Sequence, residues 1–195
     1  MDVTQTSLPG VVMVTPRRHG DDRGFFAETW NASRFAEAGI AIDWMQDNHS
    51  VSAAAGTLRG LHFQTPPHAQ DKLVRCGRGA LLDVAVDARR GSPGFGRWTA
   101  AELSAENGRQ LLVPKGFLHG FVTLEPDTEI VYKCSDVYAP DCDGAVAWDD
   151  PAIGIDWRLG GREPVLSAKD AAAGTLSEVA PPFDYDGPLP WEAEA

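Results

Sequence analysis

The feature that most constrains this fold is a series of short, strand-like segments separated by turns. The segments are rich in Val, Leu, Ile and aromatic residues and span 11–16, 79–88, 109–114, 119–124 and 128–138. The chain contains 20 Gly and 14 Pro, and turn residues gather at 91–96, 104–108, 125–127 and 139–144. Closely spaced strands without a long amphipathic helix predict an all-β sandwich or barrel. Helix is expected only locally, at 31–39 and 167–174, where an Asn or Ser start and a Gly stop bound each segment.

Length and composition predict one domain. A chain of 195 residues with 43% hydrophobic residues can bury a core of its own. We expect this domain to span 1–179, because the remaining segment, 180–195, is rich in Pro and acidic residues and reads as a surface tail. The 28 acidic residues outnumber the 17 basic ones, which argues against nucleic acid or an anionic membrane as partner. An anionic small ligand would need only a local basic pocket.

Other features predict a cytoplasmic protein. The N-terminal MDVTQTSLPG lacks the apolar core of a signal peptide. No run of about 18 apolar residues is present, so we expect no span across a membrane. Cys76, Cys134 and Cys142 are scattered without CxxC spacing, which indicates reduced thiols in place of disulfides or a zinc cluster.

The stretch LRGLHFQTPPHAQDKLVR, residues 58–75, is basic within an acidic chain. It carries Arg59, Lys72 and Arg75 together with His62 and His68. Histidine suits proton transfer near neutral pH because its unperturbed pKa is about 6.5. His62 is therefore a candidate general base, although an inert histidine in a half-buried strand would look the same.

Strand geometry sets a condition on this stretch. Side chains alternate between the two faces of a regular strand, so Arg59 and His62 would point to opposite faces. Gly60 lies between them and could supply a bulge. We therefore expect a bend at Gly60 if both side chains serve one pocket.

A metal-dependent alternative comes from PKGFLHGF, residues 114–121, which places His119 in a Pro-x-Gly-x-x-His turn. This turn and the upstream histidine-bearing strand resemble the two half-motifs of cupins, which are small jelly-roll barrels. Metal-binding cupins usually carry His-x-His followed by Glu in the first half. Here Gln64 replaces the second histidine and no Glu lies between 62 and 75. A site of three nitrogens from His62, His68 and His119 remains conceivable.

Two further side chains have two interpretations each. Asp170 in SAKD belongs to a capping box that begins at Ser167, or it orients an imidazole and stabilises its charged form. Tyr132 is an ordinary sheet aromatic or a phenolic proton donor. It shares a strand face with Ile130 and Cys134, so it could point into the barrel interior.

Two polar stretches precede this region. DDRGFFAE, residues 21–28, predicts a hairpin with a turn at 22–24, and alternation places Phe26 and Glu28 on one face. MQDNHSVS, residues 45–52, offers Gln46 and Asn48 on one face, and both amides can bind an amide-bearing ring or a sugar.

Taken together, the motifs of this chain closely resemble the dTDP-4-dehydrorhamnose 3,5-epimerase family. They occur in one order across residues 21–170: DDRGFFAE, QDNHS, LRGLHFQ, KLVRC, DVAVD, GSPGFGRW, SAEN, PKGFLHGF, VYKCSD and SAKD. The resemblance implies a jelly-roll cupin fold with a few short peripheral helices. It also implies a homodimer that exchanges N-terminal strands, a dTDP-4-keto-6-deoxyhexose substrate, and neither a catalytic metal nor another cofactor.

The resemblance also implies roles for individual residues. His62 matches the family's general base, Asp170 its orienting partner, Tyr132 the proton donor, and Lys72 the cation that stabilises the enolate. The substrate-binding positions that it implies are Arg23, Phe26, Glu28, Gln46, Asn48, Arg59, His119, Tyr138, Asp143 and Lys169.

Some of these assignments carry detail. The resemblance puts Arg23, Arg59 and His119 on the nucleotide, and the two arginines suit the diphosphate. Gln46 and Asn48 fall in the thymidine region, and Tyr138 matches an aromatic that stacks on the base. Relatives often carry Glu at position 143, and the segment from Arg23 to Glu28 would come from the neighbouring subunit. The expected reaction inverts carbons 3 and 5. The alternatives are a 3- or 5-monoepimerase, a metal-dependent cupin enzyme and a non-catalytic sugar-nucleotide binding module.

Overall fold

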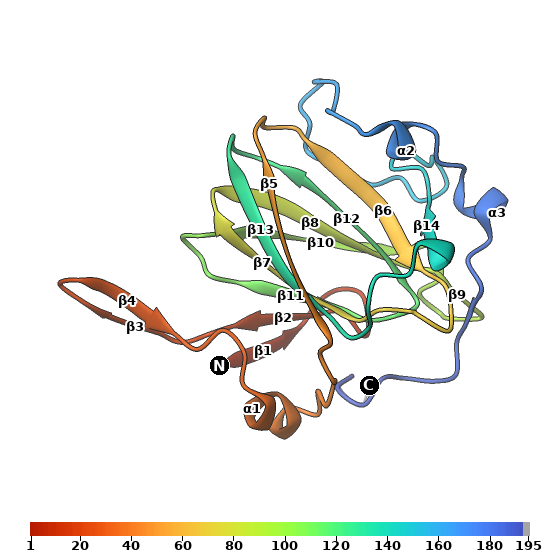
Figure 1. Cartoon of the computed structure of the whole chain (residues 1–195). Coiled ribbons are helices and arrows are strands. Elements are labelled where there is room, and N and C mark those ends of the chain that lie inside the picture. The colour runs from red at the N-terminus through yellow and green to blue at the C-terminus, as the bar shows by residue number, and fades with distance from the viewer. Residues whose placement is uncertain (193–195) are drawn as a thin grey trace.

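The computed structural model describes residues 1–192 as a β-sandwich of two facing sheets (Figure 1). The last three residues of the expected tail, 193–195, lie outside the described residues. The six-stranded sheet has the order β1 (Asp2–Gln5), β2 (Val12–Thr15), β11 (Gln110–Val113), β7 (Lys72–Arg78), β13 (Thr128–Cys134) and β5 (Gln46–Ser52). The five-stranded sheet has the order β10 (Trp98–Ser104), β8 (Ala80–Asp87), β12 (Phe117–Thr123), β6 (Leu58–Gln64) and β14 (Asp143–Ala145). Neighbouring strands in both sheets are antiparallel.

The remaining elements are short and peripheral. They are β3 (Arg18–Asp21), β4 (Gly24–Ala27), β9 (Arg89–Arg90), β15 (Phe183–Asp184), α1 (Ala32–Glu37), α2 (Ala168–Ala171), α3 (Leu176–Val179) and the 3-10 helix η1 (Pro140–Cys142). The prediction of an all-β, cupin-like fold with a few short helices is therefore confirmed. In residues 1–192, no helix has the length and apolarity needed to cross a bilayer.

The interior strand β8, between β10 and β12, shows how the core is layered. All eight of its residues are buried. Leu81 and Ala85 pack between the two sheets, whereas Leu82, Val84 and Val86 pack on the opposite face against the C-terminal third of the chain. A strand covered on both faces reads as a continuous apolar run, which explains why the segment 79–88 is so hydrophobic.

The strand predicted over 128–138 is too long. β13 ends at Cys134, and the Ser135 N–H then bonds the Asp71 carbonyl, on a loop outside both sheets. The helix expected over 167–174 is also shorter, because its hydrogen-bonded turn covers only Ala168–Ala171. β5, β7 and β10 lie outside the segments that the apolar pattern singled out. In β5, exposed residues alternate with partly buried polar ones, which leaves little apolar signal.

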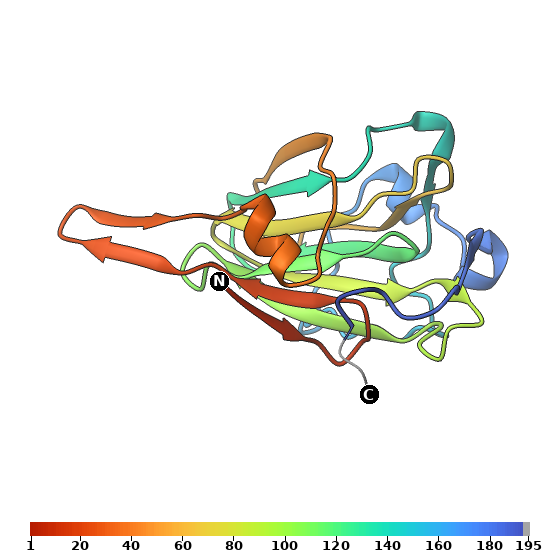
Figure 2. The same ribbon diagram turned by 90° about the horizontal axis from the view of Figure 1, so that it is seen from below.

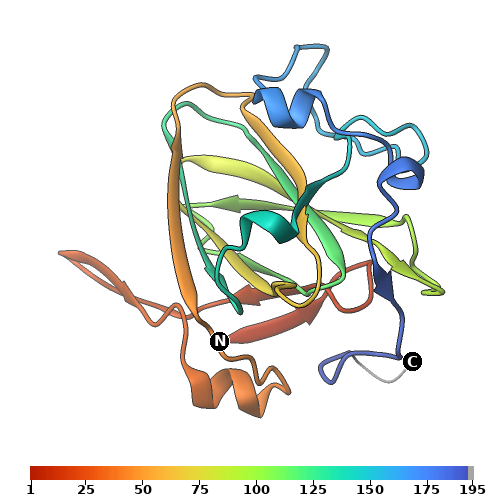
Figure 3. The same ribbon diagram turned by 45° about the vertical axis from the view of Figure 1, so that its right-hand side comes forward.

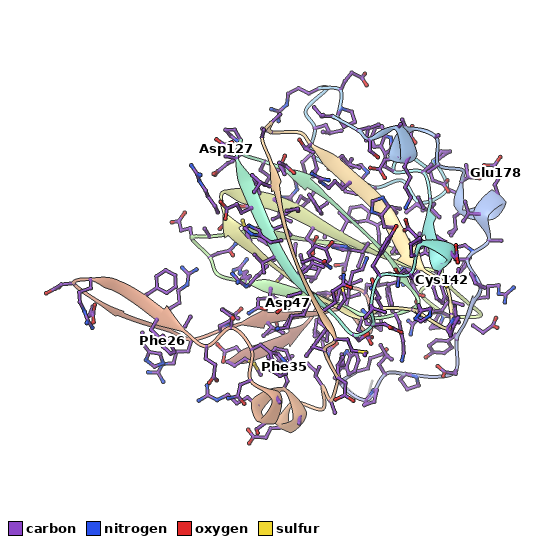
Figure 4. All side chains as sticks on the ribbon, viewed as in Figure 1. Phe26, Phe35, Asp47, Asp127, Cys142 and Glu178 are labelled. Carbon is purple, nitrogen blue, oxygen red and sulfur yellow. The ribbon has the colours of Figure 1, made fainter. Side chains whose placement is uncertain are left out.

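The predicted hairpin at 21–28 is present as β3 and β4. It projects away from the sandwich as an arm, which we define as residues 18–28 (Figures 1 and 2). Phe25 is 60% exposed and Phe26 is 71% exposed. Figure 4 shows Phe26 on this arm, away from the body of the protein. The single chain thus leaves two large aromatic side chains exposed to solvent on this hairpin.

The C-terminal segment after Val179 runs along one edge of the sandwich towards the N-terminal strands (Figure 3). β15 pairs with β9 in parallel, and Phe183 is buried against Phe63 with ring centroids 5.8 Å apart. The Trp191 indole N–H donates to the Gly10 carbonyl over 2.8 Å. The tail therefore contributes side chains to the folded body, and its separation from a 1–179 domain stays a prediction.

Candidate active site

The largest cluster of predicted site residues surrounds a cavity of about 400 Å³ at one end of the sandwich. Both sheets contribute to its walls, and most of the lining side chains are polar. The predicted residues that line it are Gln46, Asn48, His62, Lys72, Tyr132, Tyr138, Asp143 and Lys169. These positions are spread over 124 residues of sequence, and the sandwich brings them to one place.

The expected bend at Gly60 is confirmed. The side chains of Leu58, Leu61 and Phe63 all belong to the core on the outer side of the five-stranded sheet. In a regular strand 58 and 61 would face opposite sides, so the alternation of side chains between the two faces shifts by one residue between these positions. The pairing of β6 with β12 shifts register at the same point. The slip places Arg59 and His62 on the same, inward face.

Glycine is required at the bend for two reasons. The φ of Gly60 is +131°, a region that other residues rarely adopt. A Cβ at this position would lie 2.5 Å from the Gly120 Cα and 2.9 Å from the His119 carbonyl oxygen. The backbone of β12 thus approaches β6 too closely for any side chain at position 60.

His62 and Asp170 form a dyad at the cavity wall. The His62 Nε2 lies 2.5 Å from Asp170 Oδ1, and the Ser167 hydroxyl donates to Asp170 Oδ2 over 2.8 Å. The Ser167 oxygen also accepts from the Asp170 N–H, so Ser167 is the N-cap of α2 as the capping interpretation predicts, and the Asp170 carboxylate takes its hydrogen bond from the Ser167 hydroxyl. A carboxylate only accepts, so His62 Nε2 carries the proton and Nδ1 keeps its lone pair.

Electrostatics within the dyad favour a charged carboxylate. Asp170 is 3% exposed. Burial alone raises the pKa of Asp170, but hydrogen bonds from His62 and Ser167 outweigh this effect, and the net shift is downward.

Lys72 and Tyr132 approach the cavity from the six-stranded sheet, which faces the sheet that carries His62. Burial lowers the pKa of the Lys72 ammonium, and the nearby Cys134 and Asp83 oppose this shift. Burial raises the pKa of the Tyr132 phenol, and the charge of Arg59 partly offsets the rise. Tyr132 packs against the core between the sheets and lines the cavity, so it points into the interior as expected. The raised pKa means that the phenol keeps its proton at neutral pH.

The outer rim of the cavity holds a connected polar group. The Lys169 ammonium and the Tyr138 hydroxyl both donate to Asp143 Oδ2, over 2.5 and 3.2 Å. The Gln46 amide donates to Asn48 Oδ1 over 3.0 Å. Tyr138 is 56% exposed, so its ring offers a free aromatic face beside the cavity.

Two predicted ligand contacts, Arg59 and His119, do not line the cavity. Arg59 is exposed, although it is close enough to affect the Tyr132 phenol. His119 is 7% exposed and its Nε2 lies 2.8 Å from Oδ1 of the fully buried Asp83. His119 therefore lies beneath the cavity, next to Lys72 in a small void of about 10 Å³.

The predicted residues of the arm lie apart from this cavity. The side chain of Arg23 is 90% exposed at the tip of the hairpin, and Asp21 is its one ion-pair partner among residues 1–192. Glu28 accepts from the Asn31 amide and pairs with Arg34 near α1. The single chain does not bring Arg23, Phe26 or Glu28 to the other site residues.

The three histidines weighed as metal ligands are separated. His62 and His119 each bind their own aspartate, and His68 Nδ1 lies 3.3 Å from Asp136 Oδ2. Among residues 1–192, no cluster of three or more His, Cys, Asp or Glu side chains is placed to hold a metal ion. Within the described residues, His62, His68 and His119 therefore do not form the three-nitrogen metal site that the alternative requires.

Sequence reasoning missed Gln64, Gln70 and Asp83. In the sequence, Gln64 stands only where metal-binding cupins have their second histidine, yet it lines the cavity on the same face as His62. Side-chain alternation puts both residues on one face, but it gives Gln64 no role. Asp83 interrupts the apolar run of β8, and a charged residue within a buried strand is a signal of a specific partner.

Comparison with known proteins shows the family of this chain. The family model for dTDP-4-dehydrorhamnose 3,5-epimerase matches residues 5–178. The chain belongs to this epimerase family. A relative in Sinorhizobium fredii, named dTDP-4-dehydrorhamnose 3,5-epimerase, is 51% identical over 179 residues, covering 92% of this chain and 91% of the relative.

Solved structures of the epimerase family share the fold. The dTDP-6-deoxy-D-glucose-3,5-epimerase of Legionella pneumophila, in complex with dTDP-4-keto-L-rhamnose, is 42% identical with a TM-score of 0.89, covering 95% of this chain and 99% of that one. ChmJ, a 3′-monoepimerase from Streptomyces bikiniensis in complex with dTDP-quinovose, is 39% identical with a TM-score of 0.82, covering 88% and 86%. The family thus includes single as well as double epimerases.

Proposed function

We propose that this chain is an isomerase that inverts carbons 3 and 5 of dTDP-4-dehydro-6-deoxy-D-glucose and forms dTDP-4-dehydro-L-rhamnose. The observation that carries this proposal is the arrangement of a base and an acid on facing sheets. His62 reaches the cavity from β6 and Tyr132 reaches it from β13. A sugar ring between them would lose a proton on one face and gain one on the other, which inverts the carbon.

The base in this proposal is the His62–Asp170 dyad. The Nδ1 of His62 makes no hydrogen bond within residues 1–192, so its lone pair is available to take a proton beside the ketone. Asp170 holds the ring orientation and stabilises the imidazolium that forms. The downward shift in the Asp170 pKa keeps this carboxylate charged throughout the physiological range.

The enolate needs a cation at the ketone oxygen, and we assign this role to Lys72. Its half-buried ammonium lines the cavity between the two sheets. Charge stabilisation in a partly dehydrated site is strong because little water competes for the ion. Tyr132 then returns a proton on the far face. Each inversion removes and returns one proton, so it involves no net oxidation.

The nucleotide would extend over the rim. Tyr138 offers its ring to the thymine, with Gln46 and Asn48 beside it, and Asp143 and Lys169 lie next to the sugar. Arg59 would approach the diphosphate, and His119 would support the ligand from beneath the cavity. This placement rests on the polar rim and on the nucleotide-bound relative described above.

The exposed arm supports a homodimer with shared active sites. We propose that Arg23, Phe26 and Glu28 of one subunit complete the cavity of its partner.

Mixing an Arg23→Ala variant with a His62→Ala variant tests this directly. In a mixed dimer, one site has an intact His62 and an intact arm, so activity should exceed that of either variant alone. Activity that stays at the level of the separate variants would exclude arm exchange.

A cytoplasmic location is part of the proposal. It rests on Cys76, Cys134 and Cys142, all of which are free thiols.

Deuterium incorporation tests the reaction. The 4-keto sugar nucleotide is incubated with the protein in deuterium oxide, and label is located by NMR. Label at both carbons supports double epimerisation, label at one carbon indicates a monoepimerase, and label at neither indicates binding alone.

His62→Ala and Tyr132→Phe should abolish or greatly slow the reaction while dTDP still binds. The matched controls are His49→Ala and Tyr185→Phe, whose side chains lie outside the cavity.

A further inference from the structure

Residues 136–139 follow β13 and carry Tyr138, but no β-ladder holds them. Within residues 1–192, the backbone groups of Asp136, Val137 and Tyr138 make no hydrogen bond to other backbone groups. Backbone groups near the surface normally bind such neighbours or water. Here the backbone of 136–139 forms hydrogen bonds with three glutamine side chains, those of Gln46, Gln64 and Gln70. We refer to the three side chains as the amide clamp.

Gln64 is the centre of the amide clamp. Its side chain is buried, and its amide nitrogen donates to the carbonyls of His68 and Val137 over 2.7 and 3.1 Å. Its amide oxygen accepts from the Ala139 N–H over 2.9 Å. An amide offers two donors and an acceptor, and this site uses all of them. The side chain thus ties β6 to both ends of the Tyr138 peptide.

Gln70 and Gln46 hold the rest of the segment. The Gln70 amide donates to the Asp136 carbonyl over 2.8 Å, and the Gln46 amide oxygen accepts from the Tyr138 N–H over 2.9 Å. The amide clamp therefore contacts every residue from 136 to 139. Gln46, which the resemblance places on the thymidine, is already engaged in fixing the backbone of Tyr138.

We propose that Gln64, assisted by Gln70, is a positioning residue for nucleotide recognition, and that it acts by fixing Tyr138. This inference rests on the proposed function, in which Tyr138 stacks on the thymine. A segment held only by side chains would be mobile without them, and ordering it during binding would weaken affinity. The amide clamp orders the segment before the nucleotide arrives.

The substitutions follow from the chemistry of the Gln64 amide. Gln64→Leu removes all three hydrogen bonds at nearly constant volume. Gln64→Glu keeps the shape but sets a carboxylate oxygen against the carbonyls of His68 and Val137. Gln70→Leu removes a single bond and is the milder variant if position 64 tolerates no change. Gln5→Leu is the matched control, because the Gln5 amide also holds a backbone carbonyl, that of Trp191, far from the cavity.

Hydrogen exchange of the ligand-free protein tests the amide clamp without any assumption about function. In Gln64→Leu, the peptide covering 136–141 should exchange at least about tenfold faster, because the Ala139 N–H loses its acceptor and the Val137 carbonyl loses the donor that fixes the segment. Gln70→Leu should show a smaller increase, and Gln5→Leu none in this peptide. Unchanged exchange in both clamp variants would overturn the inference, whatever the enzyme proves to catalyse.

Calorimetry with dTDP tests the link to Tyr138. Gln64→Leu should raise the Kd for dTDP about tenfold and raise KM similarly, with a much smaller change in kcat. In a Tyr138→Ala background, Gln64→Leu should have little further effect on Kd, because both changes remove the same contact. Fully additive effects would refute action through Tyr138. Absence of dTDP binding by the wild-type protein would refute the proposed function and leave the exchange result standing.

Discussion

Replacement of Gly60 by Ala tests whether the bend in β6 creates the active site. The change adds one methyl group at a residue with φ +131°. That methyl would lie 2.5 Å from the Gly120 Cα and 2.9 Å from the His119 carbonyl oxygen. Both of these atoms belong to the backbone of β12, so no side-chain rotation relieves the overlap.

The expected cost has two contributions. A positive φ costs a non-glycine residue about 1–2 kcal/mol. Overpacking against rigid neighbours adds about 1–3 kcal/mol. Gly60→Ala should therefore lower the free energy of unfolding by about 2–5 kcal/mol. Gly56→Ala separates the two contributions, because Gly56 has φ +81° and nothing within 4 Å of its Cβ position. This control should lose only the first contribution, about 1–2 kcal/mol.

Urea unfolding, monitored by tryptophan fluorescence at matched protein concentration, measures both variants. Deuterium incorporation by the folded fraction then reports the active site. Gly60→Ala should also lose activity, since the relief of the overlap moves His62 relative to Asp170, whereas Gly56→Ala should stay active. Equal free energies of unfolding for the two variants, within about 0.5 kcal/mol, would refute the reasoning.

Three other changes test the site and the tail. Asp170→Asn should reduce turnover by about 10²–10⁴-fold. It should also remove a contribution to stability that is present above pH 3.8, the usual pKa of Asp, and that is lost as the pH falls through the lower pKa of Asp170 in the native state. Acid unfolding of the variant and the wild-type protein measures this contribution. Lys72→Met should abolish turnover yet raise the thermal midpoint at pH 7. Burial lowers the pKa of Lys72 in the folded protein below its usual value of 10.5. Below pH 10.5 the unfolded chain therefore binds this proton more tightly than the folded chain does, so the charged lysine destabilises the fold. Phe183→Ala should cost about 3–5 kcal/mol in urea unfolding if the tail belongs to the core.

Each of these predictions has a contrary outcome. Full turnover in Asp170→Asn would remove the dyad from the mechanism. A lower thermal midpoint in Lys72→Met would mean that the surrounding carboxylates outweigh the burial of the ammonium. A loss below about 1 kcal/mol in Phe183→Ala would support the expected division between a domain at 1–179 and a dispensable tail.

Several features were predictable because they depend on local sequence. The buried strands β8 and β12 follow from apolar runs bounded by turns, and the hairpin of the arm follows from its Asp-Arg-Gly turn. The bend at Gly60 was expected from alternation and one glycine. The length of β13 was not predictable in this way. The apolar and aromatic residues up to Tyr138 favour a strand, but the backbone leaves the ladder at Ser135 to bond Asp71.

The sequence by itself determined the fold class, the order of the motifs and the chemical types gathered at the site. Only the tertiary structure decided how those types are paired. Asp170 is 108 residues from His62 and Asp83 is 36 from His119. The packing of α2 against β6 selects the first pair and the register of β8 against β12 selects the second, without any local signal. The same holds for Gln64, whose three hydrogen bonds join segments that are adjacent only when the sandwich is closed. Local propensity acts over a few residues, whereas pairing depends on the packing of the whole chain.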